Sequence, residues 1–100
     1  MSAVIGRARV TILFAESFSI KDKRNELRSI SKRVRNKFNA GIAEIEDLDD
    51  MRAGTLGIVV VSNAGPHASQ MLNTIISFIE HSLDLGMLGD VHTELIGFDG

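Results

Sequence analysis

The chain has 100 residues, 44% of them hydrophobic and 24% charged, which is typical of a single soluble domain spanning residues 1–100. It has no cysteine, which excludes disulfides, thiolate metal sites and cysteine nucleophiles, and no stretch approaches the roughly 20 apolar residues of a membrane span, so we expect a cytoplasmic protein. The net charge of −2 is the sum of +7 up to Ala43 (ten basic, three acidic residues) and −9 from Glu44 onward (one basic, ten acidic). A charge separation of this size attracts partners of opposite charge.

The first forty residues predict a strand followed by a long helix. Apolar side chains recur at every second position of Val4–Phe14, as in a half-buried strand, and Arg7 and Arg9 fall on its other face. Ser19, with a carboxylate three residues later, forms a capping box, so a helix is expected to begin there and to run to about Lys37. The buried stripe of this helix is expected to be Leu27, Ile30, Val34 and Phe38.

The second half predicts two strands, a second helix and a last strand. Gly41–Glu46 alternates apolar with acidic residues, whereas Thr55–Val61 is apolar on both faces, as in a central strand. Pro66 suits the first turn of the second helix. Its inner face is expected to be Ala68, Met71, Leu72, Ile75, Phe78, Ile79 and Leu83. Two glycines predict a loop over Gly86–Asp90, before a final strand at Val91–Phe98.

The resulting order of elements, βαββαβ, predicts an α+β fold, the ferredoxin-like sandwich. This fold has a four-stranded antiparallel sheet in the order 4-1-3-2, with two helices on one face. The third strand is then central, which agrees with its apolar sequence. The second strand is at an edge, where its carboxylates hinder the addition of a further strand.

Five cations form a row along the predicted first helix. Their spacing of +3, +4, +4, +3 places them in one sector about 80° wide, beside the apolar stripe. They are Lys21, Arg24, Arg28, Lys32 and Arg35, and we call them the basic row. Arg33 and Lys37 lie on the other flank and widen the positive surface. A row of cations suits an RNA backbone, where each neutralised phosphate releases a counterion. The alternatives are a solvated helix face and a contact with an acidic protein.

The face of the sheet away from the helices is the second candidate surface. Arg7 and Arg9 project from it, beside positions that are partly apolar. The chain has five Phe but no Tyr or Trp, and none of these aromatics is in the third strand, so stacking of bases on the sheet is not expected. A half-apolar open face instead favours self-association, and therefore a homodimer.

No pattern predicts a metal, a cofactor or a catalytic group. The acidic segment from Glu44 to Asp50 lacks the glycine and the glutamate of a calcium loop. The three histidines share no ligand-like spacing, and the segment Ser62–His67 lacks the glycine signatures of phosphate-binding loops. We therefore expect a protein that is not an enzyme.

Four blocks of the sequence resemble the YlxP-like family, domain of unknown function 503, which comprises small uncharacterised bacterial proteins. The blocks are Ser19–Arg24, Arg35–Asn39, Ala43–Ile45 and Val59–Asn63, in the order and spacing of the family. The resemblance implies a ferredoxin-like fold. It also implies genes close to those of translation initiation and ribosome maturation, and hence a role connected with the small ribosomal subunit. It carries over no catalytic residue.

Our main hypothesis is a non-enzymatic domain that associates with structured RNA or the small ribosomal subunit through the basic row, with the acidic half of the chain facing away. One alternative is a self-associating scaffold or regulatory domain, which joins basic helix to acidic segment or packs its open sheets together. Another is a small phosphate-handling enzyme, because acylphosphatases share this topology. The corresponding loop, Ala15–Phe18, has no glycine and carries Glu16, whose carboxylate would repel phosphate. Asn63 and Arg24 can be imagined as a pair in such an enzyme, but nothing in their spacing requires it.

Overall fold

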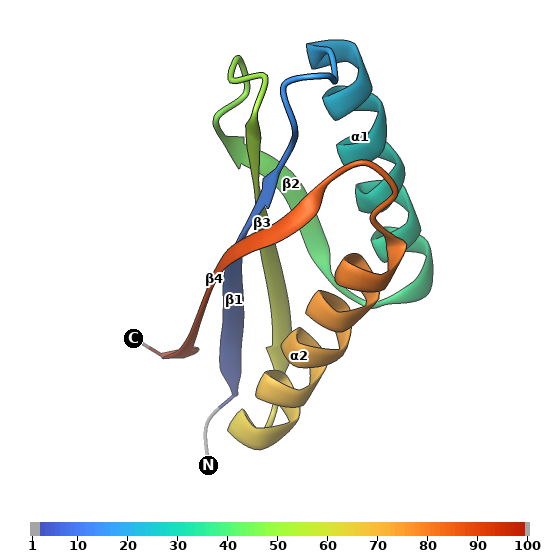
Figure 1. Ribbon diagram of the computed structural model, residues 1–100. Helices are drawn as coiled ribbons and strands as arrows, with labels where there is room; N and C mark the ends of the chain where they lie inside the picture. The colour runs from blue at the N-terminus through green and yellow to red at the C-terminus, as the bar shows by residue number, and fades with distance from the viewer. Residues whose placement is uncertain (1–2, 100) are drawn as a thin grey trace.

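A computed structural model describes residues 3–99 of the chain (Figure 1). The elements are β1 (Val4–Leu13), α1 (Ile20–Lys37), β2 (Gly41–Glu46), β3 (Ala53–Ser62), α2 (Gly65–Ser82) and β4 (Met87–Gly97). Neither α1 nor α2 is long and apolar enough to cross a membrane.

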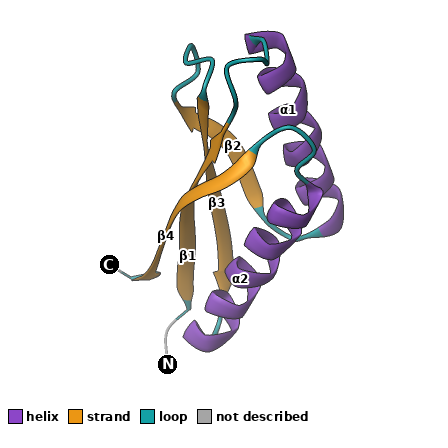
Figure 2. Cartoon of the chain, in the orientation of Figure 1, coloured by secondary structure: helices purple, strands orange, loops and turns teal. Residues whose placement is uncertain are grey.

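The four strands form one antiparallel sheet in the order β2-β3-β1-β4, which is the predicted order read from the other edge. Both helices cover the same face of the sheet, and the opposite face is open (Figure 2). The predicted α+β ferredoxin-like sandwich is therefore confirmed.

The core lies between the sheet and the two helices. Alternate residues of β1 and β3 point into it, as the period of two in their sequences requires. The apolar residues that are buried there include Ala8, Val10, Ile12, Leu56, Ile58 and Val60 from the sheet, Leu27, Ile30 and Val34 from α1, and Ala68, Leu72, Ile75 and Ile79 from α2. Both predicted helix stripes are confirmed, with Phe38, Met71, Phe78 and Leu83 partly buried at their margins.

The loop predicted over Gly86–Asp90 is wrong, because β4 already begins at Met87. Strand pairing with β1 includes this segment, although its register shifts there. A Cβ atom on Gly89 would lie 3.1 Å from the carbonyl oxygen of Thr11. Gly89 therefore permits a close approach of β4 to β1. In the sequence, a glycine that serves such an approach looks the same as a glycine that marks a turn. The third strand also begins earlier than predicted, at Ala53.

A lysine in the first turn of α1 is buried in the interior of the protein. The Lys23 side chain is 0% exposed, and its Nζ donates to the carbonyl oxygens of Asp47 (2.5 Å), Asp50 (2.6 Å) and Leu48 (3.4 Å). Glu44 Oε2 lies 3.4 Å from Nζ but receives no hydrogen bond, so its attraction to the ammonium is electrostatic. A buried charge is tolerated only when its partners replace water. Lys23 thus holds the turn between β2 and β3 against α1.

A glutamate on α1 holds the connection between α2 and β4 in a similar way. The Glu26 carboxylate accepts hydrogen bonds from the backbone N–H groups of Asp84, Leu85 and Gly86 at 2.7–3.1 Å. Hydrogen bonds to a charged acceptor are stronger than neutral ones. One cation and one anion of α1 therefore fix the turn between β2 and β3 and the connection between α2 and β4.

Replacing Lys23 by Met should lower the free energy of unfolding by about 3 kcal/mol, because it leaves three carbonyl groups and Glu44 without their cation. Urea denaturation measures this loss. Lys21→Met is the matched control, since Lys21 is exposed on the same helix turn and should change stability by no more than about 0.5 kcal/mol. Equal stability of the two variants would contradict the assigned role.

Replacing Glu26 by Ala should release the α2–β4 connection. We expect faster hydrogen exchange at the amides of Asp84, Leu85 and Gly86, and a stability loss of about 1.5–3 kcal/mol, as for hydrogen bonds to a charged group. Glu80→Ala, at an exposed position of α2, removes the same charge and should leave these amides unchanged. Unaltered exchange in Glu26→Ala would mean that the connection is held by packing alone.

Candidate functional site

The basic row is exposed along the flank of α1 that borders β2. All five side chains are accessible to solvent. From Lys21 to Arg35 the row extends over about 21 Å, at 1.5 Å per helical residue. Arg24 and Arg28 line a hollow of about 290 Å³ between α1, β2 and the turn between β2 and β3, which we call the acidic turn because it contains Asp47, Asp49 and Asp50. The capping box at Ser19 is formed as predicted, with its side chain accepting from Asp22 N–H at 3.1 Å, so the helix begins just before the row.

Two members of the row have partners within the chain. Arg24 Nη2 lies 3.6 Å from Asp49 Oδ1, an exposed ion pair of the kind that contributes little to stability. Arg35 Nη1 donates to the carbonyl oxygen of Ile42 at 3.2 Å and so contacts the outer edge of β2. Within residues 3–99, Lys21, Arg28 and Lys32 make no hydrogen bond or ion pair through their side chains. These three cations are available to a partner.

Part of the acidic half of the chain lies beside the basic row instead of facing away from it, contrary to expectation. Lys23 holds the turn after β2 against α1, and this places Asp49 next to Arg24 and Glu44 in the same hollow as Arg28. The positive potential is therefore weakened near the start of the helix. Between Arg28 and Arg35 no carboxylate forms an ion pair with the basic row within residues 3–99, so the positive charge is least neutralised there.

Arg33 and Lys37 lie on the other flank of α1, as predicted, where they contact aromatic rings. Arg33 Cζ is 5.5 Å from the ring centroid of Phe78 on α2, and Lys37 Nζ is 5.0 Å from the same centroid. Phe78 packs edge-on against Phe38 with 5.4 Å between centroids. Cation–π attraction accounts for these two positions within the fold, so they are weaker candidates for a partner than the basic row.

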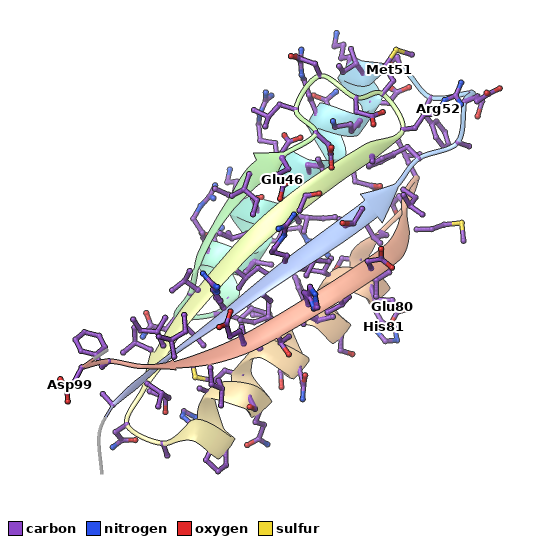
Figure 3. All side chains as sticks on the ribbon, turned by 90° about the vertical axis from the view of Figure 1, so that its left-hand side faces the viewer. Glu46, Met51, Arg52, Glu80, His81 and Asp99 are labelled. Atoms are coloured by element: carbon purple, nitrogen blue, oxygen red, sulfur yellow. The ribbon has the colours of Figure 1, made fainter. Side chains whose placement is uncertain are left out.

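The open face of the sheet carries Arg7 and Arg9, both of which are paired with glutamates. Arg7 Nη2 lies 2.5 Å from Glu94 Oε1 on β4, and Arg9 forms an ion pair with Glu46 on β2. Glu46 is labelled in Figure 3. A groove of about 800 Å³ lies over this face, with Ile45 and Val59 among its apolar lining residues. The charges in the middle of the face thus largely cancel one another.

Asn63 and Arg24, the pair considered for a phosphate-handling enzyme, are not brought together. Arg24 lies near the start of α1, whereas Asn63 follows β3 at the opposite end of the sheet (Figure 1). Glu16 in the first loop is paired with Arg52 at 2.5 Å. Within residues 3–99, no three His, Asp or Glu side chains are close enough to hold a metal ion.

Lys23 and Glu26 are the residues that sequence reasoning missed. Lys23 falls four residues before Leu27 and so continues the apolar stripe of α1 toward its N-terminus. A lysine in line with a buried stripe is a signal of burial that could have been used. Their backbone partners lie 24–60 residues away and could not be inferred from local patterns.

Comparison with known proteins gives a family and no function. The family model described as "Protein of unknown function (DUF503)" matches residues 5–89. The uncharacterized protein YlxP of Bacillus subtilis (strain 168) is 34% identical over 77 residues, which are 77% of this chain and 84% of that protein. The de novo designed protein Foldit4 has a TM-score of 0.51 at 12% identity, covering 92% of this chain and 96% of that one, a similarity of fold alone. The chain belongs to the DUF503 family.

Proposed function

We propose that this protein binds structured RNA through the basic row of α1, and that the first RNA to test is that of the small ribosomal subunit. The observation that carries the proposal is the row itself: five exposed cations on one flank, three of which have no partner within residues 3–99. Cations that serve stability alone are expected to find carboxylates nearby, as Arg7, Arg9 and Arg52 do.

The geometry favours phosphates over an acidic protein as the partner. The row is straight and about 21 Å long, which suits a regular series of charges rather than a compact acidic patch. Contacts of this kind position a protein on RNA without reading its sequence. Recognition would then depend on the shape of the RNA, with the strongest contacts between Arg28 and Arg35.

Affinity for small ribosomal subunits or structured RNA should fall steeply with salt. If three to five phosphates are neutralised, the slope of log K against log salt should be about −3 to −5. Replacing both Arg28 and Lys32 by Gln should weaken binding and make the slope less negative by about two. Co-sedimentation or a filter-binding titration at several salt concentrations measures both effects.

The matched control is the double variant Arg33→Gln, Lys37→Gln, which removes the same charge from the other flank of the same helix. It should change the slope by less than half as much. Equal effects of the two double variants would mean that overall charge, and not the row, governs binding. Absence of binding, or binding independent of salt, would contradict the proposal.

Replacing Asp49 by Asn should strengthen RNA binding, because it removes an anion 3.6 Å from Arg24. The gain should be about two- to fivefold, the range of an exposed ion pair. Asp99→Asn removes the same charge at the far end of the molecule and should have a smaller effect (Figure 3). No gain in Asp49→Asn would indicate that RNA does not reach the first turns of α1.

A further inference from the structure

The strand β4 forms one edge of the sheet and is largely exposed along its eleven residues. Val91 and Leu95, which point toward the helix side, are 39% and 42% exposed because α2 covers β4 incompletely. Within residues 3–99 no further strand pairs with this edge. A long edge with apolar side chains is a template for pairing with another strand.

The free backbone groups of this edge can be identified from one hydrogen bond. Phe98 N–H donates to the carbonyl oxygen of Ala3 at 2.9 Å, on the β1 side. The register with β1 is continuous from Gly97 to Val91, and backbone groups alternate in direction along a strand. His92, Glu94 and Ile96 therefore direct their N–H and C=O groups at β1. Val91, Thr93 and Leu95 direct theirs outward.

The opposite edge of the sheet is better protected against pairing than the edge formed by β4. Strand β2 is only six residues long, its register shifts near Glu46, and Arg35 occupies the carbonyl oxygen of Ile42. Short length, irregular register and edge charges are devices that prevent sheet addition. Strand β4 has eleven residues and contains neither Lys nor Pro, and its register shift lies before the regular stretch from Val91 to Gly97.

We propose that two copies of this chain pair through β4, antiparallel, about a two-fold axis at Thr93, so that two four-stranded sheets become one. In this register the outward backbone groups match: Thr93 meets Thr93 of the second copy, and Val91 meets Leu95. Each pair exchanges two backbone hydrogen bonds.

The side chains on the helix side are complementary in this register. Val91 lies opposite Leu95 of the second copy, and the symmetry repeats the contact, so two exposed apolar pairs become covered. The two Thr93 side chains are neighbours at the axis. A hollow of about 170 Å³, lined by Ser69 and Asn73 of α2 and by Leu95, lies beside this contact and offers room for the opposing side chain.

The side chains on the open face are complementary in charge and polarity. His92 lies opposite Glu94 of the second copy, and again the contact occurs twice. Arg7 uses only Oε1 of Glu94, at 2.9 Å from Nε and 2.5 Å from Nη2, and so leaves Oε2 for the imidazole. Opposite-charge or hydrogen-bonding pairs across strands are stabilising.

Neighbouring registers with the same faces are disfavoured by charge. A shift of one step toward His92 places Asp90 opposite Glu94 of the second copy, twice. A shift of one step toward Glu94 places the two Glu94 side chains opposite each other. Like charges in direct opposition destabilise strand pairing, so the sequence selects the register centred on Thr93 over both neighbours.

Sedimentation equilibrium tests the proposal with the full chain and the variant Thr93→Pro. Proline removes the central outward N–H but no bond to β1, so an edge strand tolerates it. The wild type should be dimeric at micromolar concentration in both low and high salt. Thr93→Pro should raise the dimer dissociation constant about tenfold or more, with an unchanged circular dichroism spectrum. Thr93→Val keeps the N–H group and should remain dimeric.

A second variant covers the case in which Thr93→Pro does not fold. Leu95→Lys places a charge at a position that is already exposed and should also give monomers. A monomeric wild type would overturn the proposal. So would a Thr93→Pro or Leu95→Lys protein that folds and dimerises as tightly as the wild type, or a wild-type dimer that dissociates in high salt, which would indicate association through charged surfaces.

Discussion

The buried ammonium group of Lys23 determines how the charged parts of this protein are arranged. Three backbone carbonyls of the turn after β2 surround it, and no water is needed to satisfy it. Because a buried cation without partners is very costly, the turn cannot move away while the helix remains in place. The acidic turn is therefore held beside the basic row. A packing requirement of the core thus decides the electrostatic surroundings of the candidate RNA-binding surface.

The division of the chain into a basic and an acidic half has several structural causes. Two of the carboxylates, Glu46 and Glu94, neutralise arginines of the first strand, and a third, Glu44, lies beside the buried Lys23. On α1 the balance differs, because Lys21, Arg28 and Lys32 have no carboxylate in contact within residues 3–99. The excess of positive charge in the sequence is concentrated by folding into a part of one helix flank. The proposal of a role in binding is supported by these unpaired cations of α1, and not by the total positive charge of the first half of the chain.

Local patterns in the sequence were sufficient for most of the fold. Periods of two and of 3.6 located the strands and helices, and the capping box at Ser19 located the start of α1. The start of β4 was mispredicted because Gly89 serves a close approach to β1, which depends on a strand about eighty residues earlier. The position of the basic row could be predicted, since helical spacing is local. The residues that surround the row could not be predicted, because Asp49 lies beside Arg24 only as a result of the contacts by which Lys23 holds the turn.

The two proposed surfaces lie at opposite edges of the same sheet, and this bears on how they would act together. The basic row borders β2, whereas self-association would use β4 at the other edge. Pairing through β4 about a two-fold axis normal to the sheet would leave both α1 helices on the same face and both rows uncovered. Two rows on one rigid assembly would bind a long RNA with higher avidity than one row, because the second contact is intramolecular. Pairing at the β2 edge would instead cover the basic row. The short length of β2, and the hydrogen bond from Arg35 to the carbonyl oxygen of Ile42, are consistent with self-association at the β4 edge and not at the β2 edge.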